Sequence, residues 1–153
     1  MSKIHALAKN YLVVFMSILA FSFVFIGEIY SSEVVIHNME SKAIGINTIG
    51  ISNVRTVEVY LPDGYEKGDK RYPVNYWLPG WTGGKGDLQN IYKNAIDKAI
   101  ADQKIPPAIV VSLDVHEGFL LLNSPVFGNW EDFIVLELIP FIDKTYFTIQ
   151  DPL

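Results

Sequence analysis

The chain of 153 residues contains no cysteine. This absence excludes a disulfide framework, a thiol nucleophile, a zinc site built on thiolates and a lipid-modified N-terminal cysteine. Basic residues are also few, since 12 Lys and Arg stand against 17 Asp and Glu and leave a formal net charge of −5. We therefore expect no nucleic-acid partner, because nucleic-acid binding needs a basic surface.

Two motifs of phosphate and ester chemistry are missing as well. Neither G-x-x-x-x-G-K-[ST] nor G-x-S-x-G occurs in the sequence, which excludes a P-loop and a nucleophile elbow within these 153 residues. The nearest string to the elbow, GISNV at residues 50–54, lacks the final glycine and precedes a predicted strand. No serine, acid and histidine follow one another in the order that a hydrolase triad of this type requires.

A long apolar run stands near the N-terminus. Lys3 and Lys9 precede the run, which covers residues 11–26. A positively charged start followed by an apolar segment indicates a secretory signal. We therefore assign residues 1–32 to a signal peptide or, as the alternative, to an uncleaved N-terminal anchor. Either assignment places residues 33–153 outside the cytoplasm, secreted or periplasmic, with membrane contact limited to the N-terminal segment.

The remaining sequence alternates strand patterns with helix patterns. The expected elements are one or two edge strands within residues 33–46, a strand over 54–62, a buried strand over 72–80, a helix over 88–104, a buried strand over 108–113 and a helix over 129–146. Buried-type strands that alternate with helices predict an α/β fold, in which helices cover both faces of a mostly parallel sheet. The earliest strands could pair antiparallel at one edge.

Several single residues carry further expectations. Arg55 and Glu58 should point outward from their strand, because the apolar residues around them fall mostly on the other face. Asp87 and Asn129 are suited to cap the two helices that follow them. The first of these helices should present one apolar stripe, and Pro140 should kink or end the second near its last turn.

Two loops are candidates for a functional site, because parallel sheets bind ligands at the carboxyl ends of their strands. The loop at residues 79–84 is rich in glycine, and its backbone N–H groups suit an oxyanion hole or a phosphate. A plain strand-to-helix turn is an equal alternative for this loop. The loop at residues 114–130 holds His116 between two acidic residues, which is too few ligands for a convincing metal site. We expect no metal and no other cofactor.

The chain also resembles a known family. Similarity to the "Putative esterase" family of the α/β-hydrolase superfamily is carried by the strings VEVYLPDGYEKGDKRYPVNYWLPGWTGG, IPPAIVVSLD and NSPVFGNWEDFIVLELIPFIDKTYFT. The family includes S-formylglutathione hydrolases (esterase D) and feruloyl esterases. One departure is that Pro79–Gly80 stands where most members have His–Gly, although esterase D relatives also replace that histidine. The resemblance implies that residues 33–153 form the N-terminal part of an α/β-hydrolase sheet, truncated before the nucleophile strand.

The resemblance also implies an activity and its residues. The family's nucleophilic serine, acid and histidine would all lie beyond Leu153, so this chain alone is expected to be inactive. The backbone N–H of Trp81, next to Gly80, would be an oxyanion donor. The expected substrate-cleft residues are Asn123, Ser124 and Trp130. The implied function is that of a fragment of a secreted or periplasmic serine carboxylic-ester hydrolase, which forms an acyl-enzyme from a small-molecule or polysaccharide-linked ester.

Two non-catalytic readings remain open. The chain could be an exported protein whose half-domain pairs with a partner chain. It could also bind carbohydrate, with Trp81 and Trp130 as stacking platforms, although a carbohydrate-binding module is more often a complete all-β unit. The sequence beyond Leu153 would separate the first of these readings from the esterase.

Overall fold

The structure is a computed structural model that describes residues 31–65, 70–80, 83–115 and 121–150. Most of the predicted signal segment lies outside these residues, so its assignment stays a prediction. Within the described ranges, no helix is both long and apolar enough to span a membrane.

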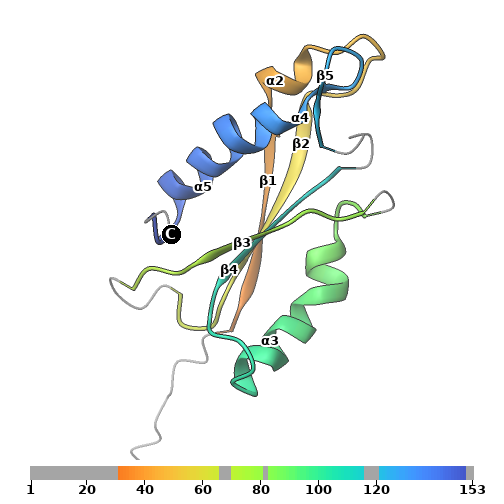
Figure 1. The fold of residues 1–153 in the computed structure, drawn as a ribbon. Helices are drawn as coiled ribbons and strands as arrows, with labels where there is room; N and C mark the ends of the chain where they lie inside the picture. The colour runs from red at the N-terminus through yellow and green to blue at the C-terminus, as the bar shows by residue number, and fades with distance from the viewer. Residues whose placement is uncertain (1–30, 66–69, 81–82, 116–120, 151–153) are drawn as a thin grey trace, which may run out of the picture.

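The centre of the fold is a four-stranded sheet in the order β1-β2-β4-β3 (Figure 1). Its strands are β1 (Glu33–Glu40), β2 (Val54–Leu61), β3 (Val74–Trp77) and β4 (Ile109–Leu113). The pairs β1–β2 and β2–β4 are antiparallel, whereas β3 and β4 are parallel. The described sheet is therefore mixed, because β2 runs opposite to both of its neighbours. The antiparallel pairing expected for the earliest strands is confirmed.

Helices cover both faces of this sheet (Figure 1). One face carries η1 (Leu88–Tyr92) and α3 (Lys93–Ala101). The other carries α4 (Trp130–Asp132), η2 (Phe133–Leu138) and α5 (Ile139–Thr145). The short elements α2 (Lys42–Gly45), β5 (Asn123–Ser124) and β6 (Gly128–Asn129) lie together at one end, where α2 contacts β6.

The hydrophobic core lies between the sheet and the α4–α5 face. Alternate residues of the strands point into it, because side chains of a strand alternate between faces. The fully buried core residues from the strands are Val57, Val59, Ile109, Val111 and Leu113, and those from the helices are Ile44, Trp130, Phe133, Leu138 and Ile142. Each such side chain contributes about 1.5–3 kcal/mol by leaving water. The last helix therefore packs one apolar face against the sheet.

The first segment contains one strand, within the expected one or two, and a short helix takes the place where a second strand was possible. Residues 42–45 form α2 because Ser41 caps it: its Oγ accepts a hydrogen bond of 3.0 Å from the N–H of Ile44. The N–H of Ala43 donates to Glu137 Oε1 of η2 at 3.0 Å, which satisfies another free donor of the helix start. Tertiary contacts thus override a local alternating pattern.

The apolar stripe expected on the helix over residues 88–104, which the structure has as η1 and α3, is only partly buried. Leu88 is fully buried, but Ile91 is 59% exposed and α3 buries no residue completely. The face of β2 that meets this helix bears Glu58 and Tyr60, whose side chains bond to it through polar groups. Polar contacts therefore attach α3 to the sheet in place of the expected apolar packing.

Two further expectations need correction. Strand β3 was expected to be buried, but it is an edge strand of the described sheet and its residues are half-buried or exposed. Pro140 does not end the last helix, which continues to Thr145. The preceding turn widens instead, and the N–H of Ile139 donates to the carbonyl of Ile134, five residues back. This wider turn accommodates a proline that has no N–H to donate.

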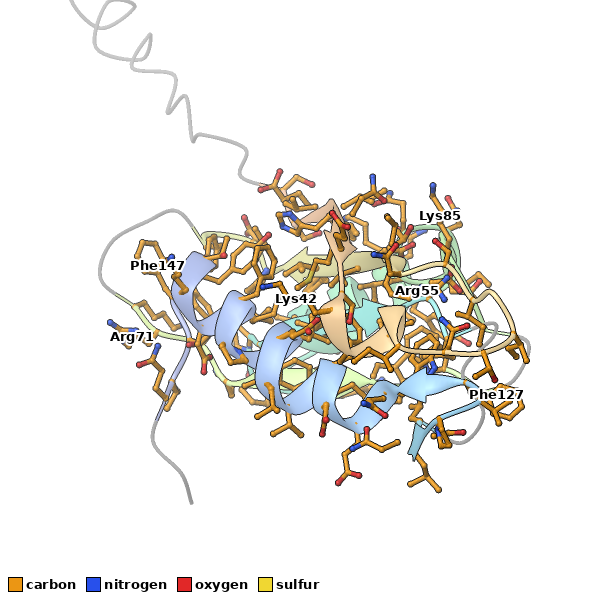
Figure 2. All side chains as sticks on the ribbon, turned by 90° about the horizontal axis from the view of Figure 1, so that it is seen from above. Lys42, Arg55, Arg71, Lys85, Phe127 and Phe147 are labelled. Atoms are coloured by element: carbon orange, nitrogen blue, oxygen red, sulfur yellow. The ribbon has the colours of Figure 1, made fainter. Side chains whose placement is uncertain are left out.

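The chain returns alongside the start of β3 after α5. The N–H of Tyr72 donates to Phe147 O at 2.8 Å, and the N–H of Ile149 donates to Tyr72 O at 2.9 Å, which makes a parallel bridge. Thr148 is fully buried, and its hydroxyl donates to Asp143 Oδ1 at 2.7 Å. Figure 2 shows Phe147 and Arg71 at one end of the molecule, opposite Arg55 and Lys85.

Candidate active site

The candidate site lies at the carboxyl ends of β3 and β4. These strands are parallel, so their carboxyl ends share one edge of the sheet. The glycine-rich loop that begins at Leu78 follows β3, and the loop that begins at Asp114 follows β4. Both loops predicted from the sequence therefore start at the same edge.

The glycine-rich loop is held in a tight conformation. The N–H of Gly83 donates to Gly80 O at 2.8 Å, which fixes the position of Gly83 relative to the end of β3. A Cβ atom at Gly83 would stand only 2.1 Å from the Cβ of Pro79, so this conformation requires glycine at that position. Trp81, the predicted oxyanion donor, lies outside the described residues, whereas Gly80 is exposed.

Two carboxylates bind the end of this loop and the residues that lead from it into η1. Asp87 Oδ2 accepts the N–H of Gly84 at 3.0 Å, so its side chain binds the loop and does not cap η1 as predicted. Glu58, a residue of strand β2, binds the start of η1 instead. Its Oε1 accepts from the N–H of Gly86, and its Oε2 accepts from the N–H of Gln89 at 3.2 Å. Glu58 is 2% exposed, so the prediction that it points outward is wrong.

Arg55 is also buried, against the prediction, and it lies beside the second loop. Its guanidinium pairs with Asp114 at 3.4 Å, directly after β4. The same group stacks on the indole ring of Trp130 at 5.3 Å from the ring centroid. A paired and stacked guanidinium can be buried where an isolated charge could not. The ion pair joins the start of β2 to the end of β4.

The three predicted cleft residues lie together around the β5–β6 hairpin. Asn123 takes the capping role expected of Asn129: its Oδ1 accepts from the N–H of Asp132 at 3.1 Å, and its Nδ2 donates to Asp132 Oδ1 at 2.8 Å. Ser124 Oγ accepts the N–H groups of Val126 and Phe127 at 3.1 and 3.3 Å. Both side chains thus stabilise the hairpin, and their contact with a substrate stays a prediction.

Trp130 differs from the other two because it is fully buried. Its indole Nε1 donates to Phe127 O at 2.8 Å, and its ring meets Phe133 edge to face. The side chain is therefore part of the core in this structure, and it presents no free face to a substrate or a sugar. This burial argues against Trp130 as a cleft residue and as a stacking platform.

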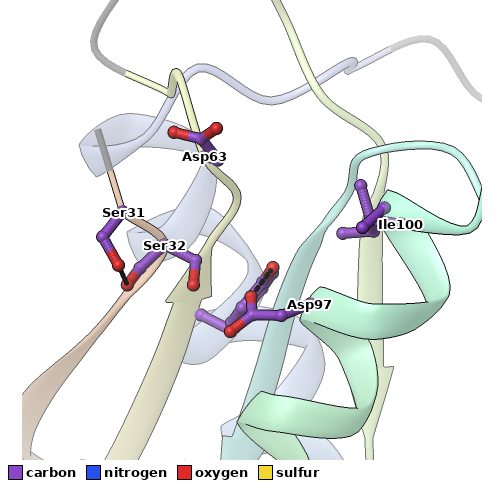
Figure 3. Close-up of a pocket in the computed structure, with 7 residues that line it drawn as sticks. Ser31, Ser32, Asp63, Asp97 and Ile100 are labelled. Carbon is purple, nitrogen blue, oxygen red and sulfur yellow. Dashed lines mark hydrogen bonds between the residues drawn. The ribbon is translucent and has the colours of Figure 1, made fainter. Parts of the chain in front are cut away.

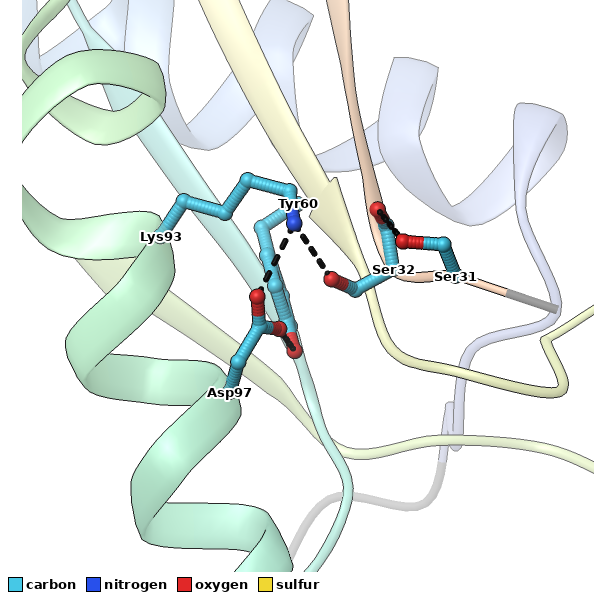
Figure 4. A network of polar contacts seen from close by, with 5 residues as sticks. All are labelled: Ser31, Ser32, Tyr60, Lys93 and Asp97. Carbon is cyan, nitrogen blue, oxygen red and sulfur yellow. Dashed lines mark hydrogen bonds and ion pairs between the residues drawn. The ribbon is translucent and has the colours of Figure 1, made fainter. Parts of the chain in front are cut away.

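A separate polar pocket of about 290 Å³ lies at the opposite edge of the sheet (Figure 3). It is lined by Ser32, Tyr60 and Asp97, and Tyr60 pairs in register with Val110 near the start of β4. Figure 4 shows Lys93 at the centre of this network. Its Nζ donates to Asp97 Oδ2 at 2.9 Å and to Ser32 Oγ at 2.6 Å.

The charges of this network are settled by its hydrogen bonds. Burial, together with the hydrogen bond to Asp97, raises the pKa of Tyr60, so the hydroxyl keeps its proton and donates to Asp97 Oδ1 at 2.7 Å. Burial alone would raise the pKa of Asp97, but hydrogen bonds from Ser32, Lys93 and Tyr60 lower it below its usual value. Every polar group in the network has a partner, which indicates a structural anchor between β1, β2 and α3.

No metal centre is indicated in the part of the chain that the structure describes. No three His, Asp or Glu side chains gather there in a way that could hold an ion. His116 and Glu117, which were weighed as metal ligands, lie outside the described residues.

The fold and the position of these loops define the first half of an α/β-hydrolase. A solved structure described as a ferulic acid esterase superposes with a TM-score of 0.66 at 25% identity, over 80% of this chain and 46% of that one. An S-formylglutathione hydrolase from Agrobacterium tumefaciens gives a TM-score of 0.53 at 12% identity, over 78% of this chain and 46% of that one, and supports the fold alone. The predicted fold class is confirmed.

The family model described as "Putative esterase" matches residues 50–152, and the chain belongs to this family. The "Endo-1,4-beta-xylanase/feruloyl esterase" of Xylanibacter ruminicola is 37% identical over 112 residues, which are 64% of this chain and 15% of that protein. "Endo-1,4-beta-xylanase Y" of Acetivibrio thermocellus is 30% identical over 107 residues, which are 67% of this chain and 9% of that protein. The chain thus spans a small part of these curated relatives and about half of the solved structures.

Sequence reasoning missed the roles of Arg55 and Glu58. Both residues interrupt an apolar strand, and a charged residue in such a strand is usually assigned to the solvent face. A signal was present, because β2 is followed by two helix-covered strands and had to lie inside the sheet. Interior strands of such sheets are covered on both faces, so their charged side chains need partners.

Proposed function

We propose that this chain is the N-terminal part of a secreted or periplasmic serine carboxylic-ester hydrolase that acts on feruloyl-type esters. The observation that carries the proposal is the glycine loop after β3, fixed by two carboxylates at the sheet edge where α/β folds bind ligands. Membership in the esterase family and the name of one relative, a xylanase/feruloyl esterase, support ester hydrolysis. An ester carried on a plant polysaccharide is a substrate consistent with that relative's name.

The proposed chemistry divides between this chain and sequence that follows it. A serine Oγ beyond Leu153 would attack the ester carbonyl carbon, and the alcohol would leave with a proton delivered by the histidine. Water would then hydrolyse the acyl-enzyme to release the acid and regenerate the serine. The N–H of Trp81 would stabilise the oxyanion of each tetrahedral intermediate. On this division, residues 1–153 alone would be inactive.

Export is part of the proposal. Residues 1–32 would direct the chain through the membrane as a signal peptide, or hold it there as an anchor. The intact mass of the mature native protein distinguishes these cases, because cleavage removes the first segment. A mature form without residues 1–32 supports secretion, whereas a form that retains them supports the anchor.

Activity is tested with the polypeptide that the gene encodes, purified from its source. Release of ferulate from methyl ferulate and from feruloylated arabinoxylan would support the proposal. An intact mass near 17.2 kDa together with no turnover of either ester or of a chromogenic acetate would contradict it. Such a result would also strengthen the second candidate.

The second candidate is a non-catalytic exported protein whose half-domain binds a partner chain. The observation that favours it is the exposed apolar surface beside β3, where Leu78 and Ile91 are 42% and 59% exposed. Strand β3 also offers an edge for pairing, since among the described residues only β4 pairs with it and the bridge from Thr148 reaches no further than Tyr72. Co-purification of a second polypeptide in fixed stoichiometry, lost in a variant with Ile91→Lys, would support this candidate.

A further inference from the structure

The carboxylate of Glu58 joins the sheet to the glycine-rich loop. It is 2% exposed in the middle of β2 and accepts two backbone N–H groups, from Gly86 and Gln89. Hydrogen bonds to an ionised acceptor are about twice as strong as neutral ones. The position at the start of η1 also favours a negative charge, because the free N–H groups of a helix start point toward it.

Pro79 and Leu88, which flank the loop, are buried, but the backbone groups between them have few other contacts that hold their position. Glycine has no side chain to pack and restricts the backbone least, and Gly86 adopts a left-handed φ of +94°. The remaining described hydrogen bonds of this segment, including those of Gly83 and Gly84, stay within the loop. Among the described hydrogen bonds of this segment, the two to Glu58 are those that reach the sheet. Glu58 therefore sets the position of the loop relative to the strand ends.

We propose that Glu58 is a positioning residue for the oxyanion loop. The inference rests on the function proposed above, because it assigns Glu58 a role in that reaction. An oxyanion donor must lie within about 2.7–3.1 Å of the developing charge, and a shift of about 1 Å reduces the rate roughly 100-fold. Glu58 does not touch the substrate: it acts through the loop that carries Gly80 and Trp81.

Two substitutions at Glu58 and one matched control test this role. Glu58→Leu removes both acceptors, whereas Glu58→Gln keeps the shape and one acceptor. The control is Asp97→Asn, which weakens another polar link between the same helix and the sheet, at the end away from the loop. All variants are made in the polypeptide that the gene encodes, with methyl ferulate as the probe.

We expect Glu58→Leu to lower kcat by about 100-fold with a KM within about twofold of the native value, because a displaced oxyanion donor affects the transition state more than substrate binding. Glu58→Gln should fall between Leu and the native protein. Asp97→Asn should retain kcat. Amide hydrogen exchange at Gly86 and Gln89 should accelerate in Glu58→Gln and stay unchanged in Asp97→Asn.

The outcomes separate the inference from the proposed function. If the native protein hydrolyses the ester and the Glu58 variants lose no more kcat than Asp97→Asn, the positioning role is wrong and the esterase stands. Unchanged exchange at Gly86 and Gln89 in Glu58→Gln overturns the inference even if Glu58→Leu fails to fold. Absence of turnover in the native protein overturns the proposed function and, with it, this role.

Discussion

Replacement of Trp130 by alanine should destabilise the fold strongly without acting through substrate contacts. The indole is fully buried between Arg55 and Phe133, 5.3 Å from the guanidinium and 6.4 Å from the phenyl ring. Its Nε1 also satisfies the carbonyl of Phe127 at 2.8 Å. Removal of the side chain therefore leaves a cavity and an unstacked guanidinium, and it removes one hydrogen bond to Phe127 O.

The magnitude follows from these losses. A buried Trp→Ala change costs about 3–5 kcal/mol through lost burial and the cavity. Loss of the indole hydrogen bond to Phe127 O adds about 0.5–1.5 kcal/mol. The two losses together reduce the folded-to-unfolded ratio by at least about 300-fold, since 1.4 kcal/mol is a factor of ten. Trp130→Phe keeps most of the volume and should lose roughly the hydrogen-bond contribution alone.

The assay is urea denaturation of the protein, followed by circular dichroism. Trp77→Ala is the matched control, because Trp77 is half-buried at the sheet edge, where its ring contacts Tyr92 at 4.2 Å. We expect Trp130→Ala to lower the free energy of unfolding by at least about 2 kcal/mol more than this control. Equal losses, or a raised KM in Trp130→Phe at native stability, would refute the assignment of Trp130 to the core.

Three further predictions follow from the fold. Gly128→Ala should cost about 1–3 kcal/mol, because φ is +91° and a Cβ would stand 2.8 Å from Ile44 O; Gly84→Ala, with open space around it, should cost much less in the same urea titration. Burial lowers the pKa of His37, which bonds to the Tyr146 hydroxyl at 2.6 Å. The neutral ring is thus favoured in the folded state, and the free energy of unfolding should fall as the pH drops below about 6.5. This loss at acid pH should be smaller in His37→Gln, and an identical pH profile of stability in the variant would contradict the role of His37. Ser41→Ala should cost about 1 kcal/mol by removing the cap of α2, as measured by the midpoint of thermal unfolding.

The sequence alone determined the class of fold and the family. Period-two and period-3.6 patterns placed β2, β4 and the last helix, because continuous or alternating apolar runs report burial directly. Glycines and prolines marked the loop after β3, since few other residues make such turns. The order of short motifs then identified the esterase family, which the family match confirmed.

The tertiary structure alone decided where the charged and aromatic side chains lie. Arg55 and Glu58 are buried because partners distant in sequence, Asp114 and the backbone of Gly86 and Gln89, satisfy their charges. Trp130 enters the core for the same kind of reason, since its packing partners come from other elements. Residue type fixes what a side chain can bond, but only the folded chain brings those partners within reach, and burial of a charge depends on their presence.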